Sequence, residues 1–355
     1  MSADQLLEVE DLSITFRLPG EGIGRRRTLH AVRDVSFTIG AGEIFGLVGE
    51  SGSGKSTTGR AVLRLVDRAS GAIRFDGTDI SSFGRRTPLK YRSDVQVIFQ
   101  DPTSSLNPRQ TVRESLSQVA RRHVSTDAQA VEAAVVEALE HVGLSEHHLD
   151  RVPNELSGGQ CQRVAIARAL IIQPRLVICD EAVSALDVST QSQVINLLMD
   201  LQRETDVAML FIAHDLTVVK HVSTSVGVMY LGRLVEVGET DEVYARAAHP
   251  YTRLLLDSTL TANPKANAAK GGWRPSAGTA REPSDALHTP AGCPFNPRCP
   301  LAVDRCREER PEPRPVPGTS QISACHFAEE VARARDLDEA VAMRDAAIVA
   351  SAPSS

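Results

Sequence analysis

The sequence lacks any uninterrupted run of 18 or more apolar residues, the length that a helix needs to span a bilayer. Its first residues, MSADQLLEVED, are acidic and lack the basic start and apolar centre of a secretory signal. We therefore expect the protein to stay in the cytoplasm. There its six cysteines are expected to be reduced, metal-bound or inert rather than paired in disulfides.

The sequence also has no excess of positive charge. Its 355 residues carry a formal net charge of -6, with 42% hydrophobic and 24% charged residues. A surface for nucleic acid would require a basic stripe, so no nucleic-acid partner is expected. The composition is that of a folded globular protein, and the length predicts one large domain with an appendage, or two domains. No internal repeat is present.

Short apolar runs alternate with helical patterns from residue 5 to about 257, which predicts an α/β layer structure for residues 1–257. The runs at 43–49, 94–100, 175–181 and 207–214 are continuously apolar, as in a parallel sheet covered on both faces. Residues 103–173 show helical periodicity alone, which predicts a helical insertion. Residues 258–290 have the composition of a linker, and residues 291–355 form a C-terminal extension with four cysteines.

The segment GESGSGKST, residues 49–57, fits the phosphate-binding P-loop pattern between a predicted strand and a predicted helix. Its glycines let backbone N–H groups turn toward a phosphate at the start of the helix. We expect Lys55 to reach the β- and γ-phosphates and Ser56 to bind Mg²⁺. The remaining residues expected to cradle the nucleotide are Gly49, Ser51, Gly52, Ser53, Gly54 and Thr57. The alternative is an ordinary glycine-rich turn.

Two acidic residues end the predicted strand in LVICDE. Asp180 lies where α/β sheets place ligand-binding groups, and we expect it to hold Mg²⁺. Glu181 is placed to polarise the attacking water. Without the P-loop, an ordinary acidic pair at a strand end would explain both residues.

A second glycine-rich segment, LSGGQ, precedes a strong helical pattern. The backbone N–H groups of Ser157, Gly158, Gly159 and Gln160 could form another anion site at that helix start. A plain helix N-terminus with Ser157 as its cap is the alternative.

Together these segments resemble the nucleotide-binding subunit of ATP-binding cassette (ABC) transporters. The resemblance covers residues 5 to about 257 and adds Gln100 of IFQDP, the SALD segment ending at Asp187, and His214 of IAHD. In this family two cassettes dimerise head to tail, and each ATP lies between the P-loop of one and the LSGGQ segment of the other. The resemblance thus implies that Ser157 and Gly159 complete the nucleotide site of a partner cassette. It also implies that the dimer opens when the γ-phosphate is lost.

The same resemblance implies roles for three further residues. Gln100 would contact Mg²⁺ or the attacking water, His214 would contact the γ-phosphate, and Phe16 would stack on adenine. A surface or core histidine and a core phenylalanine are the alternatives for the last two. Two positions depart from the common family pattern, Cys161 after LSGGQ and Ala182 after the acidic pair, and neither is expected to touch phosphate.

Segments at 100–112, 249–256 and 293–326 resemble cassettes of oligopeptide and dipeptide importers, the F-type subunit more than the D-type. This implies peptide import at the cytoplasmic face of the cell membrane. The implied partners are two membrane permease subunits, a paralogous ATPase subunit and an extracytoplasmic peptide-binding protein. Import of nickel or an oligosaccharide by the same machinery, and a non-transport ABC ATPase, are the alternatives.

The extension contains Cys293, Cys299, Cys306 and Cys325 in the spacing C-x5-C-x6-C-x18-C. Four thiolates suit a zinc ion or an iron–sulfur cluster, but the lack of a C-x-x-C pair weakens a zinc ribbon. Some peptide-importer cassettes carry a four-iron four-sulfur cluster in this extension, so the resemblance implies one here. Zinc and free thiols are alternatives, and His326 could replace one ligand. Cys161 and Cys179 are expected to pack as small apolar residues.

Overall fold

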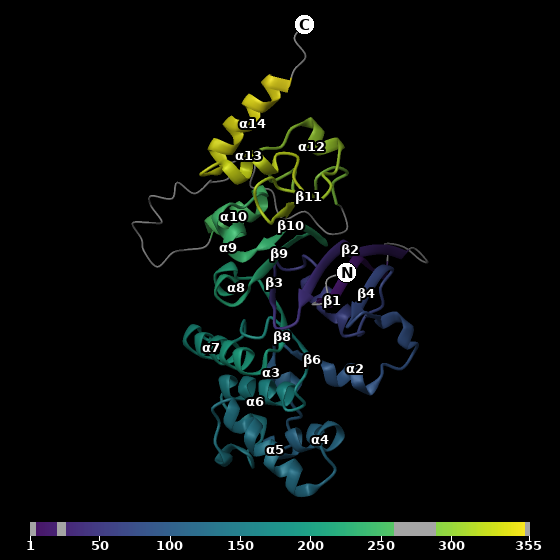
Figure 1. Ribbon diagram of the computed structural model, residues 1–355, viewed down its shortest axis with the longest axis vertical. Coiled ribbons are helices and arrows are strands. Elements are labelled where there is room, and N and C mark those ends of the chain that lie inside the picture. The colour runs from purple at the N-terminus through teal and green to yellow at the C-terminus, as the bar shows by residue number, and fades with distance from the viewer. Residues whose placement is uncertain (1–4, 20–25, 259–288, 352–355) are drawn as a thin grey trace.

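The computed structural model describes residues 5–19, 26–258 and 289–351. Two sheets occupy the middle of the molecule, with helices α4 to α6 at one end and α13 and α14 at the other (Figure 1). Residues 259–288, nearly all of the predicted linker, lie outside the described residues. The domain boundaries drawn from the sequence stay predictions.

The smaller sheet is antiparallel, with strand order β2-β1-β4-β5. The strands are β1 Gln5–Pro19, β2 Arg26–Gly40, β4 Ser70–Phe75 and β5 Thr78–Asp79. Along β1, Leu7, Val9, Leu12 and Ile14 are buried, because one face of the sheet packs on the core and the other faces solvent.

The larger sheet has the order β11-β12-β10-β9-β3-β8-β7-β6. Its central strands are parallel, as their continuous apolar sequences predicted. Their bounds are β3 Ile44–Val48, β6 Val95–Ile98, β7 Leu176–Asp180, β8 Ala208–Ala213, β9 Ser225–Tyr230 and β10 Arg233–Glu239. The β9–β10 hairpin turns at Leu231 and Gly232, both with positive φ, as the sequence indicated.

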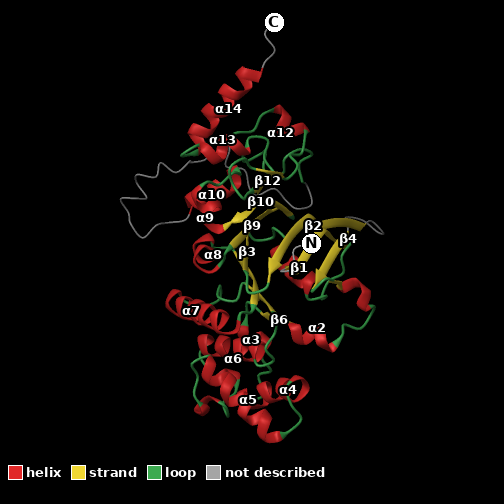
Figure 2. Ribbon diagram, viewed as in Figure 1, coloured by secondary structure: helices red, strands yellow, loops and turns green. Residues whose placement is uncertain are grey.

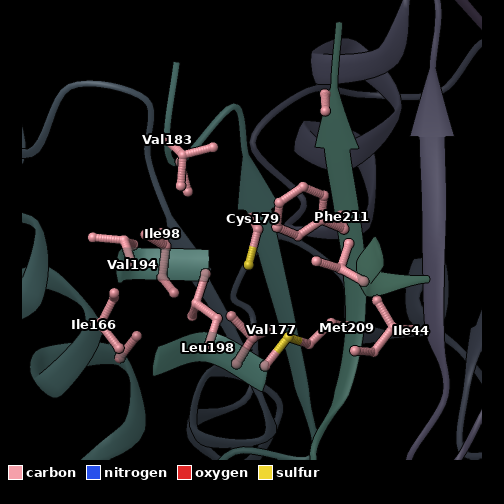
Figure 3. Close-up of a cluster of buried hydrophobic side chains, with 14 of the residues drawn as sticks. Ile44, Ile98, Ile166, Val177, Cys179, Val183, Val194, Leu198, Met209 and Phe211 are labelled. Atoms are coloured by element: carbon pink, nitrogen blue, oxygen red, sulfur yellow. The ribbon is translucent and has the colours of Figure 1, made fainter. Parts of the chain in front are cut away.

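Alternate residues of the central strands belong to two hydrophobic clusters, which lie on opposite faces of the sheet. Val177 and Cys179 of β7 gather with Phe211 of β8 on one face (Figure 3). Leu176 and Ile178 belong to the other cluster, which β1 and β2 cover. Cys161 and Cys179 are fully buried in the first cluster, which confirms their expected role as small apolar residues.

Helices fill the segment between β6 and β7, as its periodicity predicted (Figure 2). They are α3 Pro102–Ser105, α4 Val112–His123, α5 Ala128–His141 and α6 Gly158–Leu170. Thr111, Asp127 and Ser157 cap the starts of α4, α5 and α6 with side-chain oxygens, which satisfies backbone N–H groups that have no partner within a helix.

The other helices before the extension are α1 Lys55–Val62, α2 Leu89–Asp94, α7 Val188–Thr205, α8 Leu216–Val222, α9 Thr240–Ala245 and α10 Pro250–Ser258. Short 3₁₀ turns occupy Ile80–Phe83, Glu146–His148 and Pro153–Glu155. Across the described ranges, no helix combines the length and the apolar character that crossing a membrane demands.

The C-terminal extension continues the larger sheet. Its elements are α12 Asp304–Glu308, β11 Arg314–Pro315, β12 Ile322–Ser323, α13 Ala328–Arg333 and α14 Leu337–Ser351. Strand β12 pairs antiparallel with β10, Ser323 opposite Glu236, and β11 pairs with β12. The sequence did not predict these strands, because two residues each are too short to show a period of two.

Candidate active site

Four neighbouring parallel strands end at one edge of the larger sheet and carry the predicted nucleotide-site residues there. In register, Val48 of β3 lies opposite Ala213 of β8, Asp180 of β7 opposite Ile212, and Ile98 of β6 opposite Cys179. The segments that follow begin with the P-loop, His214, Glu181 and Phe99–Gln100. This edge is where open α/β sheets bind ligands.

The P-loop has a backbone that only glycine tolerates at several positions. Gly49, Gly52 and Gly54 have φ of 151°, 77° and 105°. A Cβ on Gly49 would lie 2.2 Å from the Met229 carbonyl oxygen, and one on Gly54 would lie 2.4 Å from that of Ala31. The glycines therefore allow both the positive φ angles of the loop and the close approach of neighbouring backbone. An ordinary glycine-rich turn would require only the first of these.

Lys55 is buried within the loop, with 3% of its surface exposed. Its Nζ donates to the carbonyl oxygens of Gly49 at 2.8 Å and Glu50 at 2.9 Å. Burial lowers the pKa of its ammonium, while the charges of Glu181 and Asp180 act in the opposite direction. The cation therefore lies inside the loop, on the side of the acidic pair.

A short hydrogen bond joins the P-loop helix to the acidic strand end. The Ser56 hydroxyl donates to Asp180 Oδ1 at 2.6 Å, and Asp180 is 7% exposed. A hydroxyl and a carboxylate are oxygen donors of the kind that Mg²⁺ takes in nucleotide sites. These two residues therefore fit the predicted magnesium position.

Glu181 adopts φ of 51°, a left-handed conformation that costs a non-glycine residue about 1 kcal/mol or more. Its N–H donates to the Ile212 carbonyl at 3.0 Å, and its own carbonyl accepts the Ser184 hydroxyl at 2.9 Å. These bonds hold the strained turn and leave the Glu181 side chain half-buried beside the loop. His214 and Gln100 are exposed at the ends of β8 and β6.

The LSGGQ segment forms the start of α6, in the helical end of the molecule (Figure 2). Ser157 Oγ accepts the Gln160 N–H at 3.2 Å, and Gln160 Oε1 accepts the Ser157 N–H at 2.9 Å. Ser157 and Gly158 are exposed. Within residues 26–258 no hydrogen bond joins residues 157–160 to the P-loop, so this structure does not bring the two glycine-rich segments together.

Asp187 lies at the start of α7, next to the LSGGQ segment. It caps α7, where its carboxylate accepts the Thr190 N–H at 2.9 Å and the Ser189 hydroxyl at 2.6 Å. The bond from Ser189 is the largest cause that lowers the Asp187 pKa. A Cβ on Gly159 would lie 2.5 Å from Thr190 Cγ2, so the starts of α6 and α7 are in contact.

Phe16 lies on β1 opposite Leu29 and is half-buried against the cluster under the smaller sheet. Part of its ring therefore packs in the core and part is accessible. This placement fits either of the two roles that the sequence left open.

The four extension cysteines line one pocket together with His326. Cys293, Cys306 and Cys325 are at most 9% exposed, and the Cys293 N–H donates to the Cys306 carbonyl at 2.8 Å. Burial raises the pKa of Cys293 to about 11. Over the described residues, no group of three or more Cys, His, Asp or Glu side chains is spaced for one metal ion.

Sequence reasoning missed two residues that contact the P-loop from far along the chain. The Glu50 N–H donates to the Tyr251 hydroxyl at 2.9 Å, and Arg298 of the extension pairs with the Glu50 carboxylate. Tyr251 belongs to the HPYT segment, whose likeness to peptide importers was the one signal that could have drawn attention to it.

Comparisons with known families agree with this arrangement. The ABC transporter family matches residues 32–184, which include the P-loop, the LSGGQ segment and Asp180–Glu181. A second family, the oligopeptide/dipeptide transporter C-terminal region, matches residues 235–306.

Relatives of the chain match it almost from end to end. The oligopeptide transport ATP-binding protein OppF of Haemophilus influenzae is 43% identical over 91% of this chain and 95% of its own length. OppF of Salmonella typhimurium is 44% identical over 86% of this chain and 92% of its own. A probable peptide ABC transporter ATP-binding protein of Sinorhizobium fredii is 44% identical over 96% and 95%.

Solved structures share the cassette part of the fold. CbiO1 of Clostridium perfringens, part of an ABC transporter complex, has a TM-score of 0.59 at 30% identity, covering 68% of this chain and 91% of that one. The cassette MJ0796, solved as a dimer bound to ADP and phosphate, has a TM-score of 0.59 at 26% identity, covering 66% and 98%. From the fold, the site and these similarities, the chain belongs to the family of ATP-binding subunits of oligopeptide and dipeptide ABC transporters.

Proposed function

We propose that this chain is the ATPase subunit that powers peptide import by an ABC transporter. The observation that carries the proposal is the 2.6 Å bond from Ser56 to Asp180, which joins the P-loop to the acidic strand end beside Glu181. Nucleotide phosphates, their metal ion and an attacking water need these three groups within one small volume. The relatives named for peptide transport support the substrate class.

Within this site each residue has a proposed role. The N–H groups of residues 49–57 hold the phosphates, and Lys55 moves from the loop carbonyls to the β- and γ-phosphates. Ser56, Asp180 and Gln100 hold Mg²⁺, which when bound neutralises charge on the phosphate oxygens. The Glu181 carboxylate accepts a hydrogen bond from the attacking water, and His214 contacts the γ-phosphate.

The active unit proposed here is a pair of cassettes, most simply this chain with a paralogous ATPase subunit. Ser157 and Gly158 of the LSGGQ segment are exposed, and the segment makes its hydrogen bonds away from its own P-loop, as expected for a segment that serves a partner's nucleotide. The related cassette MJ0796 is dimeric. Asp187, next to the start of α6, would lie at the same interface.

Transport also requires subunits that this chain does not supply. We place the chain at the cytoplasmic face of the cell membrane, bound to two permease subunits, with an extracytoplasmic binding protein that delivers the peptide. Gln100, at the junction of β6 and the helical segment, is positioned to relay the nucleotide state to that segment and thus to the permease.

A purified complex tests this function. The chain, isolated from membranes with the subunits that accompany it, should show ATP hydrolysis that peptides stimulate in the presence of the binding protein. A Lys55→Ala complex is the matched control. Stimulation by nickel or an oligosaccharide instead would replace the substrate class, and ATPase activity with no permease attached would favour a non-transport ATPase.

We further propose that the four extension cysteines hold a four-iron four-sulfur cluster. Burial raises the pKa of the Cys293, Cys299 and Cys325 thiols, which stay protonated unless a positive centre compensates their thiolates. All four extension cysteines line one pocket, as the ligands of a cluster would. Because the described residues contain no group of three or more Cys, His, Asp or Glu spaced for one metal ion, the proposal rests on the shared pocket and on the resemblance to peptide-importer cassettes that carry a cluster. Protein purified anaerobically should contain iron and sulfide and absorb visible light; colourless, iron-free protein would refute the cluster.

A further inference from the structure

Glu50, the second residue of the P-loop, contacts the C-terminal extension through its carboxylate. Arg298 Nη1 donates to Glu50 Oε2 at 3.0 Å, and Nη2 donates to Oε1 at 2.9 Å. The side chains are 16% exposed for Arg298 and 30% for Glu50. Two parallel charge-assisted bonds fix the direction as well as the distance of the carboxylate, and partial burial limits their screening by water.

The backbone of the same residue is held on both sides. The Glu50 N–H donates to the Tyr251 hydroxyl at 2.9 Å, and the Glu50 carbonyl accepts Lys55 Nζ at 2.9 Å. A chain of contacts therefore runs from Arg298 through Glu50 to the lysine expected to bind phosphate. Movement of Glu50 would change the position of the Lys55 ammonium.

Arg298 itself is held by packing. Its guanidinium carbon lies 5.7 Å from the ring centre of Phe295 and 5.9 Å from that of Tyr230. These rings pack against each other and against Tyr251 with centres 4.6 to 5.4 Å apart, and all three are almost fully buried. Cation–π contact and the buried rings fix the guanidinium before any nucleotide arrives.

The charge balance gives this contact a consequence for nucleotide binding. Glu50 follows Gly49, in the loop whose N–H groups are expected to hold phosphate, and an unpaired carboxylate there would repel a triphosphate. We infer that Arg298 is a positioning residue of the nucleotide site: it neutralises Glu50 and fixes the P-loop, so that the extension raises the affinity for ATP. The inference rests on the proposed ATP-binding function and is independent of what the cysteines hold.

Equilibrium binding of a fluorescent ATP analogue with Mg²⁺ to the full chain tests this inference. Arg298→Gln should weaken binding by about tenfold, because a charge-assisted pair is lost and a negative charge is exposed. In a Glu50→Gln background, the same substitution should change affinity by less than about threefold. Arg305→Gln, which breaks a similar two-bond pair with Glu309 inside the extension, is the matched control and should bind as the wild type does.

The dependence on Glu50 separates positioning from a merely structural role. If Arg298 only stabilised the extension, its loss would cost the same in both backgrounds, and that result would overturn the inference. So would wild-type affinity in Arg298→Gln. Arg298→Lys keeps the charge with fewer hydrogen bonds, so its ATP affinity should lie between those of the wild type and Arg298→Gln. It takes the place of Arg298→Gln in the test if the glutamine variant does not fold. Failure of the wild type to bind ATP would instead refute the proposed function.

Discussion

A buried carboxylate under the HPYT segment gives the sharpest test of how the extension is joined to the cassette. Glu236 on β10 is 1% exposed. Its Oε1 accepts the Ala248 N–H at 2.6 Å, and its Oε2 accepts the His249 N–H at 3.1 Å. Opposite Glu236 in the sheet is Ser323, whose hydroxyl donates to the Ala248 carbonyl. The Glu236 side chain thus holds the turn before α10 against β10, and Ser323 ties the same turn to β12, the strand that the extension adds.

Removing this carboxylate should destabilise the fold by an amount set by the two N–H groups. Each buried donor left without an acceptor costs about 1–3 kcal/mol, so Glu236→Ala should cost about 2–6 kcal/mol. Glu236→Gln keeps one acceptor oxygen and should cost about half as much. Glu308→Gln, a change of the same kind at an exposed position in α12, should leave stability nearly unchanged and serves as the control.

The pH dependence of the Glu236→Gln effect has a definite sign. Burial is the largest cause that raises the pKa of Glu236, from its ordinary 4.5 to about 7, against the lowering effects of the two N–H bonds and of Arg253. Between these pH values the folded state binds a proton that the unfolded state has lost. The free energy of unfolding of the wild type therefore falls by about 1.4 kcal/mol per pH unit, relative to that of Glu236→Gln, as pH rises through this range. His249, whose pKa burial lowers to about 3, titrates alike in both proteins and cancels.

Urea denaturation followed by circular dichroism at pH 5, 6, 7 and 8 measures these differences. The advantage of the wild type over Glu236→Gln should shrink up to about pH 7 and then level off. A difference that is constant over this range, or a Glu236→Ala variant as stable as Glu236→Gln, would refute the account of a buried, hydrogen-bonded carboxyl group.

Three shorter predictions concern the nucleotide site and the core. Glu181→Gln should still bind ATP but hydrolyse it about 100-fold or more slowly and form dimers that persist in ATP on size-exclusion chromatography; normal turnover would remove Glu181 from its role. Ser157→Arg should leave ATP affinity of the isolated chain unchanged and lower the ATPase rate of the assembled pair; reduced affinity of the chain alone would count against a shared site. Gly46→Ala places a Cβ 2.3 Å from Val219 Cγ1 and should lower the free energy of unfolding by about 1–3 kcal/mol, measured by thermal unfolding. An unchanged melting temperature would show that α8 shifts to accommodate the added methyl group without cost.

Much of the candidate site was accessible from the sequence because its signals are local. The P-loop, the Asp180–Glu181 pair and the LSGGQ segment each lie within ten consecutive residues, next to strands or helices with clear periodicity. Because β7 and β8 are parallel neighbours in the sheet, His214 and Glu181, which follow them, lie at the same edge. The Leu231–Gly232 turn was likewise visible as a break between two apolar runs.

What the sequence by itself determined, then, is the chemistry of each loop and the type of most elements that carry it. The tertiary structure alone decided that β12 extends the cassette sheet beside β10, that four cysteines meet in one pocket, and that Arg298 reaches Glu50 across 248 positions of the chain. Such contacts join residues that are far apart in the chain and have no shared period. They form only when the packing of the buried core has fixed where each segment lies.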